Sequence, residues 1–224
     1  MKANYTQIAI VLDRSGSMGS VRQATVEAFE GFMENQKKDP NQTDVLFVQF
    51  DGESPHDVVF DGDAKKFDKL QYSPRGSTPL HDAMGWTITT LGRRLEGLPE
   101  AERPDKVLIV IMTDGEENSS LEYNHASVAE LVKHQQDNYN WQFLFLGANQ
   151  DAVLTAKTYN IAIHASSCFD PSSTGMRSAI GAMNATTDMW KYSNSNAKIE
   201  ITDEQRKLYE NIKDKLTSGN QSSK

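Results

Sequence analysis

The sequence predicts an α/β protein, a three-layer sandwich in which helices cover both faces of a mostly parallel central sheet with one short antiparallel edge strand. Three observations lead to this prediction. Residues 8–12 and 107–112 are short, unbroken apolar runs, which are typical of strands buried on both faces, and residues 141–146 are apolar except for Gln142. Segments with apolar residues every three or four positions alternate with these runs. Residues 45–50 and 56–60 are joined by a link too short for a helical crossover, which indicates an antiparallel hairpin.

The size, composition and charge of the chain limit the classes of protein to consider. With 224 residues, of which 38% are hydrophobic and 24% charged, the chain suits one soluble α/β domain with a large core. The net charge of −8 argues against a broad basic face for nucleic acid, and no apolar run approaches the roughly 20 residues of a membrane helix. We therefore expect neither nucleic acid nor a membrane as a partner.

The cysteine content and the first residues bear on the compartment. Cys168 is the only cysteine, so an intrachain disulfide and a cysteine-based zinc site are both excluded. The first residues have neither the apolar core nor the small-residue cleavage pattern of a signal peptide. We therefore expect a cytoplasmic protein.

The first third of the chain is predicted to form a strand, a helix and the hairpin. After the strand at 8–12, Ser20 and Gln23 have the spacing of a capping box, which predicts that a helix begins there. Lys38 and Pro40 mark its end, with a cation in the last turn and then a proline. The apolar face of this helix comprises Val21, Thr25, Ala28, Phe29, Phe32 and Met33.

The middle of the chain continues the alternation of helices and strands. One helix precedes the strand at 107–112, and another over residues 123–136 precedes the strand at 141–146. A short helix from Asp151 leads to a last, weak strand at 161–163. The inward side chains of the first of these helices are Leu80, Met84, Ile88, Leu91 and Leu95.

The C-terminal region is predicted to add helices to a Rossmann-like core. A helix over residues 173–192 carries apolar side chains on one face. Thr202 and Gln205 form a second capping-box pattern, which opens a further helix with Leu208, Tyr209, Ile212 and Leu216 on one side. We divide the chain into a domain at 1–192, a C-terminal helical extension at 193–217 and a disordered tail at 218–224.

Oxygen-bearing side chains gather at one edge of the predicted sheet. Asp13 and Asp114 each follow a buried strand, and the carboxyl ends of parallel strands face the crevice in which α/β proteins bind ligands. The hydroxyls of Ser15 and Ser17 follow the first strand, and Thr78, in a loop before a helix, can reach the same edge. These five oxygen donors, without imidazole or thiolate, favour Mg²⁺, Mn²⁺ or Ca²⁺ over zinc. Neutral hydroxyls leave such a cation incompletely neutralised, with room for one outside anion.

Each of these segments also has a simpler interpretation. The aspartate and two serines at 13–17 are compatible with a polar turn and a cap. Thr78 before a proline has the pattern of a helix N-cap, and Asp114 before a glycine has that of a common turn. The metal site is favoured because three independent interpretations would otherwise have to coincide at one edge of one sheet.

Together, the three segments resemble the von Willebrand factor A domain. Asp-Arg-Ser-Gly-Ser at 13–17, Gly-Ser-Thr-Pro-Leu at 76–80 and Thr-Asp-Gly-Glu at 113–116 match the metal-ion-dependent adhesion site of that family, Asp-x-Ser-x-Ser…Thr…Asp, in order and in structural context. The resemblance covers about residues 5–165, and all five ligand positions are filled. Residues 147–151 and the helices that follow resemble intracellular bacterial and phage members more than secreted adhesins.

The resemblance implies a role for each site residue. In the family, the residues that match Ser15, Ser17 and Thr78 coordinate Mg²⁺ directly in the liganded form. Those that match Asp13 and Asp114 act largely through bound water, and an Asp or Glu of a protein partner takes the sixth coordination position. The implied function is therefore that of a metal-dependent protein–protein interaction module.

Two alternative functions stay open at this stage. One is an adaptor or subunit of an AAA-type ATPase complex, as some intracellular family members are, although the chain has no phosphate-binding loop of its own. The other is a Mg²⁺-dependent phosphatase or phospho-acceptor enzyme, but such enzymes have a second carboxylate where this chain has Ser15, and no Gly-x-Ser-x-Gly pattern is present. We expect a binding module and not an enzyme. Self-association through a neighbour's acidic side chain also stays open.

Four further polar residues lie near the predicted site. Asp82, in the first turn of the helix after Thr78, is expected to offset the helix dipole or to support the site. Glu116 and Glu117 are expected to lie in a solvated loop at its rim. Asn149 follows a strand at the same edge, where an N-cap is a more common role than a ligand contact.

Overall fold

The computed structural model describes residues 1–148 and 151–205, and within these ranges six strands form a single sheet in the order β3-β2-β1-β4-β5-β6. All neighbouring strands are parallel except the β2–β3 pair, which is antiparallel and places β3 at one edge. This arrangement confirms the predicted fold class. The strands are β1 (Lys2–Asp13), β2 (Gln42–Asp51), β3 (Ser54–Asp63), β4 (Pro104–Thr113), β5 (Gln142–Gly147) and β6 (Ser166–Cys168).

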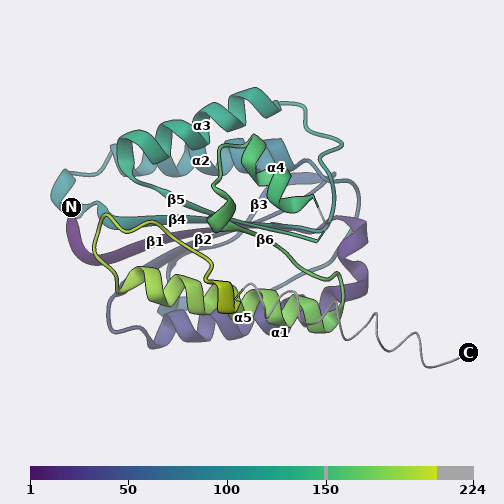
Figure 1. Ribbon diagram of the computed structural model, residues 1–224, viewed down its shortest axis with the longest axis horizontal. Coiled ribbons are helices and arrows are strands. Elements are labelled where there is room, and N and C mark those ends of the chain that lie inside the picture. Colours follow the sequence, from purple (N-terminus) through teal and green to yellow (C-terminus); the bar gives the residue numbers. More distant parts are fainter. Residues whose placement is uncertain (149–150, 206–224) are drawn as a thin grey trace, which may run out of the picture.

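Helices cover both faces of the sheet, as Figure 1 shows. One face carries α1 (Arg22–Lys38) and α5 (Ser173–Lys191), which pack side by side. The opposite face carries α2 (Leu80–Glu96), α3 (His125–Tyr139) and the short α4 (Ala152–Thr158). In the described part of the chain, none of the helices combines the length and the apolar character needed to cross a bilayer.

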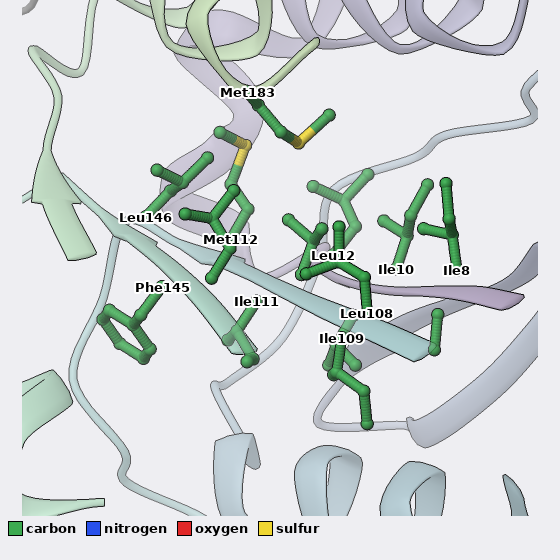
Figure 2. Packing of buried hydrophobic residues seen from close by; sticks show 14 of the residues in the cluster. Ile8, Ile10, Leu12, Leu108, Ile109, Ile111, Met112, Phe145, Leu146 and Met183 are labelled. Carbon is green, nitrogen blue, oxygen red and sulfur yellow. The ribbon is translucent and has the colours of Figure 1, made fainter. Parts of the chain in front are cut away.

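The core lies on both sides of the central strands β1 and β4. Figure 2 shows Leu12, Met112 and Leu146 pointing toward Met183 of α5, while the alternate side chains of β4 and β5 point to the other face. This alternation is the period of a strand, and here both faces are apolar because both are covered. Each of these fully buried aliphatic side chains contributes roughly 1.5–3 kcal/mol relative to an exposed one.

Side chains and backbone conformation fix the helix ends. Asn124 and Ser127 form a reciprocal capping box at the start of α3, and Asn140 ends that helix in the left-handed conformation with φ of 53°. Ser172 caps α5 by accepting a hydrogen bond of 3.1 Å from the backbone N–H of Gly175. Helix α1 ends with Lys37 and Lys38 in its last turn, as predicted.

Two local predictions are wrong, and a third needs adjustment. The capping box at Ser20 and Gln23 does not form, because the chain winds through a 3-10 turn, η1 (Gly16–Val21), and α1 begins only at Arg22 without a side-chain cap. Residues 161–163 are not a strand: Ile161 is buried as a packing contact, and the last strand is β6, three residues further on. The edge strand β3 is also longer than predicted, with 10 residues.

Two buried lysines fasten the C-terminal end of α5 to the rest of the fold. Lys106 of β4 donates hydrogen bonds from Nζ to the carbonyls of Trp190, Lys191 and Ser193, at 2.5, 2.9 and 2.8 Å. Lys191 pairs with Asp39, the residue that ends α1, and also donates to Gln36 and Thr43 at 2.9 and 2.7 Å. The last turn of α5 is therefore held by both layers that it touches.

The described residues end at Gln205, the last residue of the second predicted capping box. The Thr202 N–H donates to Gln205 Oε1 at 2.7 Å and the Gln205 N–H donates to Thr202 Oγ1 at 3.2 Å, which confirms that box. The helical face at 208–216 and the tail at 218–224 lie outside the described residues, as does Asn149. The division of the chain at residue 192 stays a prediction.

Candidate metal site

The site begins at Asp13, where β1 ends. The Asp13 side chain is fully buried, and each of its oxygens accepts a hydrogen bond: Oδ1 from the backbone N–H of Ser15 at 2.7 Å, and Oδ2 from the hydroxyl of Thr113 at 2.6 Å. Thr113 is the last residue of β4. The ends of the two central strands are therefore joined through one carboxylate.

Hydroxyl groups extend this hydrogen bonding toward solvent. The Oγ atoms of Ser15 and Ser17 are 3.0 Å apart, and Ser17 Oγ donates to Asp114 Oδ1 at 2.6 Å. Asp13 and Ser15 are buried, whereas Ser17 is exposed and Asp114 is half-buried. Four of the five predicted site residues therefore form one hydrogen-bonded chain, which runs from the protein interior to the surface. We call these four residues the oxygen chain.

The fifth residue, Thr78, reaches the same place from the loop before α2. A Cβ atom built on Gly115 would lie 3.3 Å from Thr78 Oγ1, so the threonine hydroxyl lies directly against the residue that follows Asp114. Thr78 is held through its backbone, which exchanges two hydrogen bonds with Asn118 at 2.9 and 3.2 Å. Its side chain does not cap α2, whose N-cap residue is Pro79. The simple N-cap interpretation of Thr78 is therefore wrong.

Buried Asp51 fastens the first two loops of the site to each other. Its Oδ2 accepts hydrogen bonds from Nε of Arg14 at 2.6 Å and from Nε of Arg75 at 3.1 Å. The backbones of the two loops also meet: Arg75 N–H donates to the carbonyl of Arg14 at 2.8 Å, and Gly16 N–H to that of Gly76 at 3.1 Å. Gly76 has φ of 64°, a conformation that favours glycine. The sequence indicates a turn at Asp51 but not this role.

Two carboxylates hold the third loop, which follows β4. Glu117 accepts hydrogen bonds from the backbone N–H groups of His81, Ser119 and Ser120, each at 2.8 Å. Asp82 is buried and accepts from three successive N–H groups, those of residues 121–123, at 2.8–2.9 Å. Glu117 therefore lies in a loop that is largely exposed, as predicted, but its own carboxylate is a structural acceptor with a side chain only 18% exposed. Asp82 ties the third loop to the start of α2, which is a supporting role.

The electrostatics of the site favour a cation. Burial raises the pKa of Asp13 to about 6, although hydrogen bonds from Thr113 and Ser15 act in the opposite direction. Burial also raises the pKa of Asp114. The adjacent guanidinium of Arg14 is directed toward Asp51 and Asp57 and does not neutralise these two carboxylates. A metal ion would stabilise both ionised carboxylates.

The donor set fits a small, hard cation. Mg²⁺ holds oxygen ligands at 2.0–2.1 Å in an octahedron, so that neighbouring ligand atoms lie about 2.9 Å apart. The hydroxyl oxygens of Ser15 and Ser17 are 3.0 Å apart, close to this spacing. Within residues 1–148 and 151–205, no three His, Cys, Asp or Glu side chains come together in a way that could hold a metal ion. Any ion at this site would therefore depend on hydroxyl ligands as well as on the two carboxylates.

A mostly parallel sheet between two helical layers, with hydroxyl and carboxylate oxygens at its carboxyl edge, defines a Rossmann-like α/β domain with a candidate site for a hard cation. Residues 7–179 match the family model of the von Willebrand factor type A domain. Because this match covers well over half of the chain, the chain belongs to the von Willebrand factor type A family. None of the curated proteins is significantly similar to it in sequence.

Several solved structures are similar in fold. The pilus adhesin SpaC from Lactobacillus rhamnosus GG, in an open conformation, superposes with a TM-score of 0.60 at 15% identity, over 83% of this chain and 30% of that one. Proximal thread matrix protein 1 from the mussel byssus gives 0.53 at 14% identity, over 80% and 45%. BatB from Bacteroides thetaiotaomicron gives 0.51 at 15% identity, over 84% and 100%. The chain thus spans less than half of the adhesin and of the mussel protein, and these likenesses establish the fold alone.

Proposed function

We propose that the chain is a protein–protein interaction module that binds Mg²⁺ at a complete metal-ion-dependent adhesion site and, through the metal, a carboxylate of a protein partner. Mn²⁺ and Ca²⁺ are alternative ions for the same oxygen donors. The oxygen chain is the observation that carries the proposal. It brings together groups from two loops, and Thr78 of a third loop lies beside them.

Each site residue has a proposed role. Ser15, Ser17 and Thr78 would hold the metal directly, and Asp13 and Asp114 would hold waters of its coordination shell, as the family resemblance implies. The bound cation would supply a Lewis-acidic position for an incoming carboxylate. The exposure of Ser17 and the half-burial of Asp114 support an approach from solvent, and buried Asp13 would keep the inner side rigid.

A similar structure supports the metal part of the proposal. The mussel byssus protein has been solved with zinc in its metal-ion-dependent adhesion site, and this structure superposes on 79% of the present chain, and on 46% of its own, with a TM-score of 0.55 at 12% identity. The choice of Mg²⁺ over zinc rests on the present chain, whose candidate ligands are all oxygen atoms.

We further propose that the site binds without catalysing a reaction. Among the described residues, the hydroxyls of Ser15 and Ser17 hydrogen-bond to each other and to a carboxylate, and no histidine or lysine contacts them as a general base.

The likeness of residues 147–151 to intracellular family members supports a cytoplasmic location.

The metal site can be tested directly with Mn²⁺, whose binding is followed by the relaxation rate of water protons. Ser17→Ala removes the central hydroxyl of the oxygen chain at an exposed position, so the fold should be retained while affinity for Mn²⁺ falls roughly tenfold or more. Ser20→Ala, on the same 3-10 turn but outside the oxygen chain, is the matched control and should bind like the wild type. Equal affinity in both variants would contradict the site.

The open coordination position needs a second experiment. A short peptide with one aspartate, added to the Mn²⁺-loaded protein, should displace an exchangeable water and lower the relaxation rate. The same peptide with asparagine in place of aspartate is the control and should have little effect. If both peptides act alike, or neither acts while the metal stays bound, carboxylate recognition through the metal is wrong.

A further inference from the structure

We propose that a groove beside the candidate metal site binds an arginine side chain of the same protein partner whose carboxylate reaches the metal. The groove has a volume of about 430 Å³ and lies between the first turns of α2 and α3 and the helix α4, where β4 and β5 end. This inference rests on the proposed function and adds a second recognised residue of the partner to it.

The groove is continuous with the candidate metal site. Thr113, whose hydroxyl donates to Asp13 Oδ2 at 2.6 Å, lines the groove. Gly115 lines it too, and a Cβ atom built on that residue would lie 3.3 Å from Thr78 Oγ1. A partner whose carboxylate reaches the metal therefore places its neighbouring residues over the groove. Side chains two positions apart point the same way in an extended chain, so the residue two before or two after the acidic one is the residue that enters.

Four rings that contact one another line the groove. The ring of Tyr159, directly after α4, has its centre 4.7 Å from that of His125 and 6.3 Å from that of Phe145. The ring of His81 is 5.8 Å from Tyr159. Leu154 of α4 also lines the groove and is 62% exposed. Arginine suits these walls, because its planar guanidinium stacks on rings and its methylene groups pack on an exposed leucine.

The charge of the groove favours a cation. Glu116 and Glu117 line it, and none of its lining residues is a lysine or an arginine. Burial alone would raise the pKa of Glu117, but hydrogen bonds from backbone N–H groups and from Ser120 outweigh it and lower the pKa, which keeps this carboxylate ionised. Burial lowers the pKa of His81, so that its ring adds no positive charge at pH 7.5. A guanidinium therefore complements both the rings and the negative charge, whereas an apolar side chain complements only the rings.

Three peptides test the inference on the Mn²⁺-loaded full chain at pH 7.5. Each has one aspartate between alanines, and the residues two before and two after it are arginine, citrulline or phenylalanine. Citrulline has nearly the shape of arginine but no charge. The fall in the relaxation rate of water protons gives the affinity of each peptide. We expect the arginine peptide to bind roughly 3- to 10-fold more tightly than the citrulline peptide, and more tightly than the phenylalanine peptide. Equal affinity of the first two, or tighter binding of the third, would overturn the proposal.

Two glutamates of the loop after β4 provide matched variants. Glu116→Gln changes an exposed residue of the groove, so the variant should fold, and its preference for arginine over citrulline should fall to about 2-fold or less. Glu122→Gln is the control, because Glu122 is exposed and does not line the groove. It should keep the wild-type preference. Both variants lose the same charge, so an equal fall in the two would show general attraction to an acidic protein and would refute the groove.

The same titrations separate this inference from the proposed function. If every aspartate peptide displaces water from Mn²⁺ with the same affinity, carboxylate recognition holds and only the arginine groove is wrong. If none of the peptides displaces water while Mn²⁺ stays bound, carboxylate recognition through the metal is wrong, and the arginine groove falls with it.

Discussion

Replacement of Lys106 by methionine should lower the free energy of unfolding by about 3 kcal/mol, because the buried ammonium is the donor to the last carbonyls of α5. The side chain is 5% exposed, and its Nζ also lies 5.1 Å from the centre of the Trp190 ring. Burial lowers the pKa of Lys106, while the charge of Asp105 raises it. Methionine has a similar length and no donor, so the change removes the hydrogen bonds with little change in packing.

The magnitude follows from opposing contributions. A hydrogen bond to a charged group contributes roughly 1.5–3 kcal/mol, and Lys106 makes three to backbone carbonyls. The carbonyl of Trp190 keeps another donor, Ser193 Oγ at 2.6 Å, so the loss there is partly compensated. The variant also avoids the cost of burying an ammonium, which is several kcal/mol. When the avoided cost of burying the ammonium is subtracted from the lost hydrogen bonds, the free energy of unfolding falls by about 3 kcal/mol.

Urea unfolding followed by circular dichroism measures this loss, and hydrogen exchange in the last turn of α5 locates it. Lys133→Met is the control: this lysine pairs with Asp137 on the surface of α3, with side chains 63% and 57% exposed, and its loss should cost less than about 0.5 kcal/mol. A loss below about 1 kcal/mol for Lys106→Met, or one equal to the control, would refute the view that the ammonium holds the end of α5.

Two further predictions concern packing and the buried carboxylate at the site. Gly85→Ala should destabilise the protein by more than about 1 kcal/mol, because the new Cβ would lie 2.2 Å from the ring of Tyr123. Gly31→Ala is the control: its Cβ would have no atom within 4 Å, so the change should stabilise the protein by up to about 1 kcal/mol. Thermal melts measure both variants, and equal shifts in melting temperature would contradict the contact with Tyr123. Burial alone would raise the pKa of Asp51, but hydrogen bonds from backbone N–H groups and the charge of Arg14 outweigh it and lower the pKa. The free energy of unfolding of the wild type should therefore exceed that of Asp51→Asn by about 3 kcal/mol at neutral pH, and this difference should shrink as the pH falls below about 4. Urea unfolding measures it, and a difference that does not change with pH would be inconsistent with an ionised Asp51.

The fold was predictable because its signals are local. Apolar runs fill the centres of β1 and β4. The residues from Ile8 to Leu12 in β1 and from Leu108 to Met112 in β4 are at most 1% exposed. Helix α2 follows its spacing of three and four residues, and its inward side chains are buried as the spacing requires. Patterns of this kind depend on which faces are covered and need no knowledge of distant partners.

Two features that the sequence did not indicate depend on contacts between distant segments. Strand β6 contains buried Ser166 and Ser167 and forms because β5 offers it a free edge, which is not visible in its own residues. Glu117 looked like a surface carboxylate, but the N–H group of His81, 36 residues away, makes it a structural acceptor. The five candidate metal residues were found because their order and spacing match a known motif. Asp51, which fastens two of their loops, has no such motif.

The oxygen chain has a consequence for the timing of assembly. Ser17 contacts a residue 97 positions later, and Asp13 contacts one 100 positions later. During translation, the first half of the site therefore has nothing to bond with until the strand that carries the second half has emerged from the ribosome and docked beside β1. Closing so long a loop is slow compared with local folding. An unfinished polypeptide should therefore lack the proposed cation site, which would become complete only when the central strands have met.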